Sequence, residues 1–260
     1  MSTLKSKAEQ ILQEKETNII PENIKNGVQI FDVEGTYSGG NSIDLTTGIK
    51  FACSTFSTLP NNIITANWGN ITDMNNMFAD CASLTTIPQL NTSNVTNMSY
   101  LFQGCANLTS VALLDTTNVT DMSGMFADCG NLTTIPQLNT TNVVYMDSMF
   151  SGCTSLTTLP QLNTSNLKYA GYMFYYCSAL TTISGFDFSN VVEIQYMFAE
   201  CKNLQELDIR TIDFNSASGV DEDFLINVPN NCHIKVSSSE FKDLLLEHYP
   251  DLTNIEVVNN

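Results

Sequence analysis

Six cysteines at a constant spacing are the first residues of this chain that could do chemistry. They lie 24 residues apart, at Cys81, Cys105, Cys129, Cys153, Cys177 and Cys201. A disulfide requires two side chains that point at each other with a defined torsion, whereas side chains stacked in register point the same way. A metal site requires two to four ligands that converge from short spacings. We therefore expect free thiols that pack as small apolar groups, with no bound metal or cofactor.

Catalytic groups are scarce elsewhere in the chain. The two histidines, His233 and His248, both lie near the C-terminus, and neither belongs to a nucleophile or metal motif. The phosphate-binding, nucleophile-elbow and zinc-protease motifs do not occur. The sequence therefore predicts no catalytic residue and no enzymatic activity.

The residues around each cysteine repeat at the same interval, so the structural element that positions it is itself repeated. A phenylalanine stands three residues before each cysteine, at Phe78, Phe102, Phe126, Phe150, Phe174 and Phe198. A fixed period of 20–50 residues is typical of stacked repeat architectures. One repeat cannot bury its own apolar face, so we expect the phenylalanine and cysteine columns to form a continuous core.

Each repeat has two halves with different patterns. In Asn94–Cys105 apolar residues recur at helical spacing, which predicts a short helical segment with Asn94 as its N-cap. The second half, typified by L-T-T-I-P-Q-L-N, is β-branched and then breaks at proline and asparagine. It predicts a strand of two or three residues. The expected fold is an α/β solenoid, a leucine-rich-repeat stack of short parallel strands and short helical segments.

The outward-pointing side chains of the short strands form the candidate ligand face. We call this set the strand face: Thr86, Ser110, Thr134, Pro136, Thr158, Pro160, Thr182, Ser184, Glu206 and Asp208. Side chains alternate along a strand, so the neighbours of each buried apolar residue must face outward. The stripe bears mostly hydroxyl groups and turns acidic at its end. It is either a ligand-binding surface or a solvated spacer.

The ends of the chain differ from the repeats. The predicted domains are an N-terminal helix-plus-strand module at 1–37, a linker at 38–49, a degenerate capping repeat at 50–69, six 24-residue repeats at 70–213 and a C-terminal cap at 214–260. Within the cap we expect a strand after Cys232, a helix that Ser237 or Ser238 caps, and a closing strand from Ile255. Such caps shield the terminal core faces of a solenoid.

The composition limits the partners. The net charge is −17, and charged residues make up only 14% of the chain. Without a basic run to offset this acidity, we expect no binding to nucleic acid. The N-terminal residues carry no apolar secretion signal, and no stretch is long enough to cross a membrane, so we expect synthesis in the cytosol and no membrane insertion.

The block N-V-T-N-M-S-Y-L-F-Q-G-C-A-N-L-T-S, at 94–110, closely resembles the BspA-like class of leucine-rich repeats. This class includes a domain of unknown function in surface proteins of Firmicutes and mycoplasmas. The resemblance spans roughly residues 50–257 and implies adhesion or surface recognition without catalytic residues.

The N-terminal stretch, at 7–37, resembles a module of tail and baseplate proteins in phages of Gram-positive hosts through the pattern I-x-P-E-N-I-K-x-G-V. Together, the two resemblances imply a non-enzymatic virion protein, made in the host cytoplasm. In this hypothesis 1–37 binds other tail or baseplate proteins, and the solenoid binds a glycan or protein of the host surface. The alternatives are a BspA-like adhesin on a bacterial surface and a purely architectural virion decoration. The sequence does not fix the number of copies, and a homo-oligomer stays open.

Overall fold

The computed structural model describes residues 33–34, 50–51, 57–59, 71–219 and 223–258. The predicted attachment module, the linker and most of the degenerate repeat lie outside the described residues. From these regions the structure gives β1 (Val33–Glu34), which pairs antiparallel with β2 (Lys50–Phe51).

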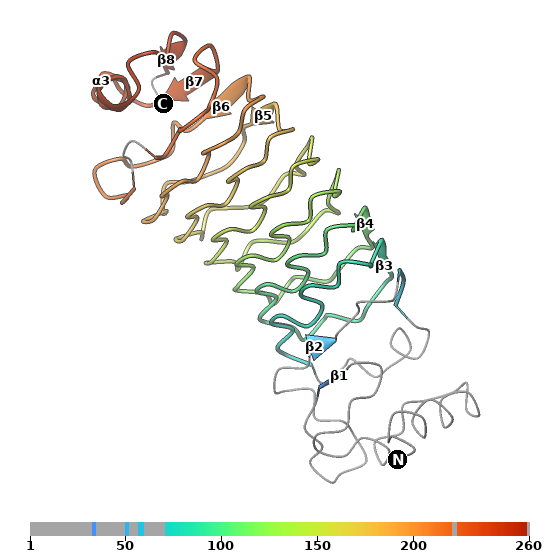
Figure 1. Cartoon of the computed structure of the whole chain (residues 1–260). Coiled ribbons are helices and arrows are strands. Elements are labelled where there is room, and N and C mark those ends of the chain that lie inside the picture. Colours follow the sequence, from blue (N-terminus) through green and yellow to red (C-terminus); the bar gives the residue numbers. More distant parts are fainter. Residues whose placement is uncertain (1–32, 35–49, 52–56, 60–70, 220–222, 259–260) are drawn as a thin grey trace, which may run out of the picture.

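The repeats stack as a solenoid, as the sequence predicts (Figure 1). One column of contacts is formed by the short strands β3 (Thr86–Ile87), β4 (Ser110–Val111), β5 (Thr182–Ile183) and β6 (Glu206–Asp208). β3 pairs parallel with β4, and β5 pairs parallel with β6, each with a shift of one repeat. The prediction of short parallel strands is confirmed.

Strand pairing lapses in the middle of this column. Ala112 donates its backbone N–H to Ile87 at 2.9 Å and closes the ladder between β3 and β4. Pro136 and Pro160 occupy the corresponding positions in the next two repeats, and proline has no N–H to donate. No strand is assigned at residues 134–135 or 158–159, which both lie within the described range.

The half-repeat expected to be helical forms turns instead, and residues 71–219 contain no helix. Alternate amides donate to the following repeat rather than along a helix: Phe126 N–H, for example, bonds the carbonyl of Met149 at 3.0 Å. The amides between them reach only three residues back, as from Cys129 to Phe126 at 3.1 Å. Stacking offers the backbone partners 23 residues away, and these compete with the i to i−4 bonds of a helix.

The asparagines that begin four of the repeats, Asn118, Asn142, Asn166 and Asn190, are not helix caps. Their side-chain amides donate to a backbone carbonyl of the preceding repeat, as from Asn142 to Thr117 at 2.9 Å and from Asn166 to Thr141 at 2.7 Å. These asparagines therefore tie neighbouring repeats together, and their regular spacing reflects the stack rather than a helix start.

The core runs unbroken through the stack. The six phenylalanines are fully buried and stack ring on ring, with centroids 5.7–6.0 Å apart between consecutive repeats. The described part of the degenerate repeat continues the register, since Thr58 bridges Thr86 in parallel and Leu59 is buried.

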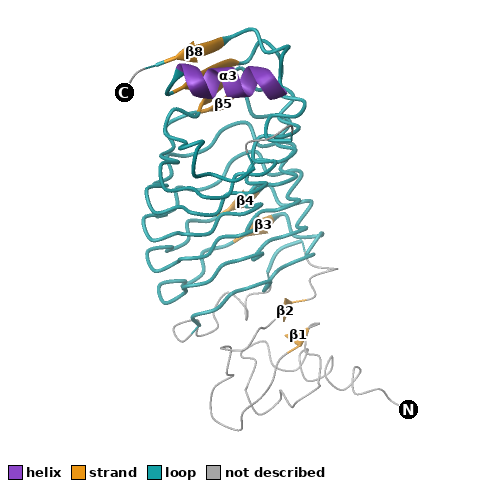
Figure 2. Cartoon of the chain, turned by 90° about the vertical axis from the view of Figure 1, so that its left-hand side faces the viewer, coloured by secondary structure: helices purple, strands orange, loops and turns teal. Residues whose placement is uncertain are grey.

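The C-terminal cap closes the strand column, as Figure 2 shows. β7 (His233–Val236) pairs in parallel with β6, β8 (Ile255–Val257) pairs in parallel with β7, and α3 (Ser239–His248) lies between β7 and β8 in the chain. Ser238 caps α3 by accepting the N–H of Phe241 at 3.1 Å. The predicted strands and the capped helix are confirmed.

Candidate ligand-binding face

The strand face lies on the outside of the stack. All ten of its residues are exposed or half-exposed, and they alternate along the chain with buried apolar residues such as Ile87, Val111 and Ile183. Because the repeats are in register, the ten side chains form one stripe along the solenoid, with threonine or serine from each repeat from Thr86 to Ser184.

The hydroxyl groups of the strand face are uncommitted, which here means that no described residue hydrogen-bonds them, unlike the hydroxyls of the neighbouring columns. Thr109 Oγ1 donates to the carbonyl of Thr85 at 2.9 Å, and the buried Thr140 Oγ1 donates to Asn163 at 2.8 Å. By contrast, no described residue hydrogen-bonds the hydroxyls of the strand face, which are those of Thr86, Ser110, Thr134, Thr158, Thr182 and Ser184. These hydroxyls can bond a ligand without breaking a contact inside the protein.

A cleft of about 220 Å³ opens on the strand face where strand pairing lapses. Its walls include four predicted residues, Thr158, Pro160, Thr182 and Ser184, and its apolar lining includes Leu159 and Phe186. Leu159 is only partly buried, whereas Ile183 in the next repeat is fully buried. The sequence alone does not predict this cleft, which opens between the Pro160 repeat and the repeat that follows it.

A larger groove, of about 920 Å³, lies beside the strand face. Its side-chain amides are committed to the stack: Gln89, Gln137 and Gln161 each donate to a carbonyl of the next repeat, at 2.6, 2.6 and 2.7 Å. Binding there would compete with contacts that hold the repeats together. Gln161 also lines the smaller cleft, but the hydroxyls of Thr158, Thr182 and Ser184 there make no such bond to a described residue, so we favour the smaller cleft as the ligand site.

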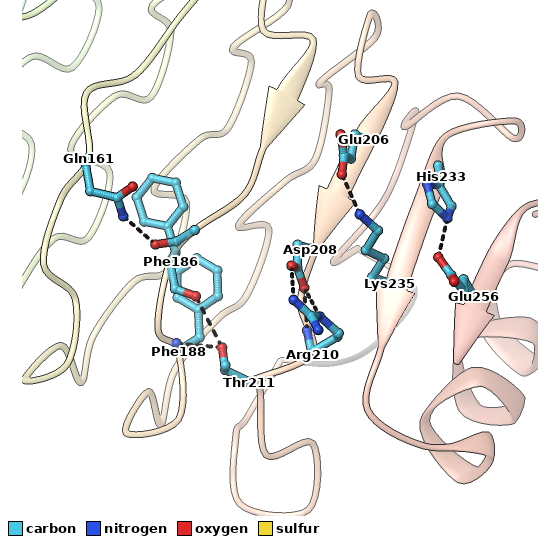
Figure 3. A network of polar contacts seen from close by, with 11 residues as sticks. Gln161, Phe186, Phe188, Glu206, Asp208, Arg210, Thr211, His233, Lys235 and Glu256 are labelled. Carbon is cyan, nitrogen blue, oxygen red and sulfur yellow. Dashed lines mark hydrogen bonds and ion pairs between the residues drawn. The ribbon is translucent and has the colours of Figure 1, made fainter. Parts of the chain in front are cut away.

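The acidic end of the strand face is neutralised by one basic residue of the last repeat and one of the cap (Figure 3). Glu206 pairs with Lys235 at 2.7 Å, and Asp208 accepts two bonds from the guanidinium of Arg210, at 2.9 and 2.8 Å. Hydrogen bonding from Arg210 lowers the pKa of the Asp208 carboxyl. These two carboxylates are therefore less available to a ligand than the hydroxyls.

The cysteine column is part of the core. Cys81, Cys105, Cys129, Cys153, Cys177, Cys201 and Cys232 are free and buried. Five of the thiols donate to the carbonyl of a phenylalanine in the preceding repeat, for example from Cys153 to Phe126 at 3.1 Å. Burial raises the pKa of Cys153 and Cys201 to about 12. Such thiols are protonated at neutral pH and are poor nucleophiles.

The histidines form no catalytic group. His233 Nε2 lies 2.8 Å from Glu256 on the exterior of the cap, and His248 ends α3 on an exposed position. Among the described residues, no three His, Cys, Asp or Glu side chains gather as metal ligands would. A helix of the length and apolarity that a membrane span requires is likewise not found in the described part of the chain.

Comparison with known proteins identifies the repeat family. The family described as "Mycoplasma protein of unknown function, DUF285" matches residues 47–133 and 109–212. A search of the curated proteins found no match.

Two solved structures are similar. A leucine-rich repeat protein of T. pallidum has 20% identity and a TM-score of 0.44, with 78% of this chain and 86% of that chain covered. A leucine-rich cell surface protein of Faecalibacterium prausnitzii has 18% identity and a TM-score of 0.21, with 73% of this chain and 77% of that chain covered.

Proposed function

The chain belongs to the DUF285 family, and from this premise we propose that it is a non-catalytic recognition protein of a bacterial cell surface. In this proposal the strand face binds a neutral glycan or a protein of the opposing surface. The resemblance of the repeats to BspA-like surface proteins supports the location. The observation that carries the binding role is the row of uncommitted hydroxyls around the cleft at Thr158, Pro160, Thr182 and Ser184.

The chemistry of the face favours a neutral, hydrogen-bonding ligand. Threonine and serine hydroxyls both donate and accept, and the proline and leucine surfaces beside them offer apolar contact. Small sites of this kind combine a few polar groups for orientation with apolar walls for affinity. The acidic end, at Glu206 and Asp208, is neutralised by Lys235 and Arg210 and adds little net charge.

Binding of the purified chain to immobilised glycans and to intact cells tests the proposal. Thr158→Arg and Thr134→Arg place a bulky charge on the strand face and should abolish binding, whereas Thr158→Ser keeps the hydroxyl and should retain it. Ala106→Arg is the matched control, because Ala106 is exposed on a turn of another half-repeat. Equal binding by wild type, Thr158→Arg and Ala106→Arg would exclude the strand face as the site.

The virion hypothesis remains a prediction that rests on the N-terminal sequence pattern. Residues 1–32 and 35–37 lie outside the described residues, and the family match begins at residue 47. The family and the repeat resemblance favour a bacterial surface over a virion. Mass spectrometry of purified virions from a host strain would detect the chain if the virion hypothesis holds, and wild-type cells would then show no chain on their surface.

A further inference from the structure

Six of the nine tyrosines of the chain gather on the turn half of three consecutive repeats. We call this group the tyrosine platform: Tyr145, Tyr169, Tyr172, Tyr175, Tyr176 and Tyr196. Tyr145 and Tyr176 are 42% and 41% exposed, and the other four are half-buried. The platform belongs to the opposite half-repeat from the strand face, so it is a separate surface.

The rings hold one another in place. Tyr145 stacks on Tyr169 and Tyr172 stacks on Tyr196, each pair with centroids 4.9 Å apart and planes within 10° of parallel. Tyr175 meets Tyr172 edge-on at 5.7 Å and Tyr176 at 5.2 Å. Because each ring is fixed by a neighbour, a ligand would bind without much loss of side-chain freedom.

The backbone of the platform is strained. Tyr172, Tyr176 and Tyr196 have φ values of 57°, 60° and 54°, in the left-handed region that disfavours bulky side chains. Asn76 and Ser148 occupy the same place in other repeats as Tyr172 and Tyr196. Smaller polar residues can therefore adopt the same turn. The tyrosines add half-exposed aromatic surface, although a bulky side chain is less favourable than a small one in this backbone conformation. The same left-handed φ occurs at Tyr100, outside the platform, so it is a property of the repeat turn and what distinguishes the platform is the number of rings gathered there.

Negative charge accompanies the aromatic rings. Gly171 stands between Tyr169 and Tyr172, and a β-carbon placed on it would lie 3.4 Å from Asp147 Oδ1 and 3.7 Å from Glu193 Oε1. The two carboxylates therefore lie close together beside Gly171, where Asp147 Oδ1 accepts the N–H of Gly171 at 3.0 Å and Glu193 Oε1 accepts from the side chain of Gln195 at 2.7 Å. Burial raises the pKa of Asp147, and the charge of Glu193 adds to the effect. The charged residues at the platform are Lys168 and Lys202 against Asp147, Glu193 and Glu200, and Lys202 is paired with Glu200.

One ring of the platform already holds a cation. Lys202 Nζ lies 5.4 Å from the centre of the Tyr176 ring while it pairs with Glu200 at 2.8 Å. A tyrosine face attracts ammonium and guanidinium groups within about 6 Å of its centre. This contact shows that the exposed tyrosine rings can bind the cationic side chains of lysine or arginine.

We propose that the tyrosine platform docks a basic segment of a partner protein, whose lysine or arginine side chains lie on the rings beside Asp147 and Glu193. The argument is charge complementarity. Exposed tyrosines and converging carboxylates on a chain of net charge −17 select a cationic partner over an acidic one. Tyrosine is also enriched among the residues that dominate the binding energy of protein interfaces.

Calorimetric titration of the full chain with a twelve-residue peptide of alternating arginine and glycine tests this proposal. The double variant Tyr169→Asn/Tyr172→Asn should bind the peptide about tenfold more weakly, given the usual size of one or two cation–π contacts. Asn97 and Asn76 occupy the equivalent positions in other repeats, so the variant is expected to fold. It also keeps the net charge, which separates loss of the rings from loss of general electrostatic attraction.

Two variants control the experiment. Tyr100→Asn makes the same change at a left-handed tyrosine, φ 55°, three repeats before Tyr172 and outside the platform, and it should leave the affinity unchanged. Thr158→Arg changes the strand face and removes no residue of the tyrosine platform. Peptide contacts with the platform should therefore be unaffected in this variant. Failure of one proposal is thus distinguishable from failure of the other.

Three outcomes would overturn the docking proposal. The first is no binding of the arginine peptide by the wild-type chain. The second is equal binding by wild type and the double variant, which would reduce the platform to internal packing. The third is loss of neutral-glycan binding, but not of peptide binding, in the double variant, which would assign the platform to a sugar.

Discussion

Truncation of Phe126 to alanine tests the stacked core most directly. Its ring is fully buried and lies between Phe102, at 5.7 Å and 20°, and Phe150, at 6.0 Å and 4°. Removing a buried phenylalanine costs about 3–5 kcal/mol through lost transfer energy and the cavity left behind. Two ring contacts are lost together, so we expect the upper part of this range.

The assay is urea unfolding followed by circular dichroism. With a urea dependence of roughly 3 kcal/mol/M, the upper limit for small proteins, the midpoint should fall by about 1–1.7 M. Because each repeat contacts only its neighbours, the weakened centre should also uncouple the two ends of the stack and broaden the transition. Hydrogen exchange should show the largest loss of protection in the repeats on either side of Phe126.

Leu113→Ala is the control for this measurement. Leu113 is 57% exposed, so its truncation should change the stability by less than about 0.5 kcal/mol. A Phe126→Ala variant that unfolds at the same urea concentration as Leu113→Ala would refute the continuous phenylalanine column.

Three further predictions concern the backbone and the buried charge. Gly152→Ala should lower the stability by about 1–2 kcal/mol, since Gly152 has φ 73° and a β-carbon there would overlap the carboxylate of Asp128, whereas Gly130→Ala should be nearly neutral in the same melting experiment. Pro160→Ala restores a backbone N–H, so its new amide should exchange slowly in deuterium oxide; fast exchange would show that proline does not cause the lapse in pairing. Asp147→Asn should raise the melting temperature at pH 7, because burial raises the pKa of the folded-state carboxyl above its unfolded value and makes its ionised form unfavourable. The gain should vanish below about pH 3, where the carboxyl is protonated in both states, and a gain that persists there would contradict the assignment to charge.

The backbone amide of Ala112 shows why the loss of strand pairing at residues 134–135 and 158–159 could not be predicted from the sequence. Pro88 also follows a strand, and β3 forms all the same. The hydrogen bond that completes the pairing of β3 with β4 is donated by Ala112 of the next repeat to the carbonyl of Ile87, and Pro88 takes no part in it. A proline therefore breaks the pairing with the repeat before it, not the strand it follows. The cleft lies on the other side of Pro160, toward Thr182 and Ser184 of the following repeat, so the missing proline N–H does not account for it.

The tyrosine platform escaped the sequence analysis for a related reason. Tyr145 and Tyr172 stand at different places within the repeat, and the ring stacks form only between repeats. A pattern read along a single repeat shows polar turn residues at these positions. The available signal was the density of tyrosine between residues 145 and 196.

The sequence by itself determined the period, the core columns, the parallel stack and the strands and helix of the cap. Apolar side chains at fixed spacing have one way to leave water together, so their burial follows from the pattern. Only the tertiary structure decided that the Asn-to-Cys half forms turns, which hydroxyls are uncommitted and where the cleft opens. Each of these depends on hydrogen-bond partners 23–27 residues away, such as the Phe126 carbonyl that accepts the thiol of Cys153. Such partners come within reach only when the repeats have stacked.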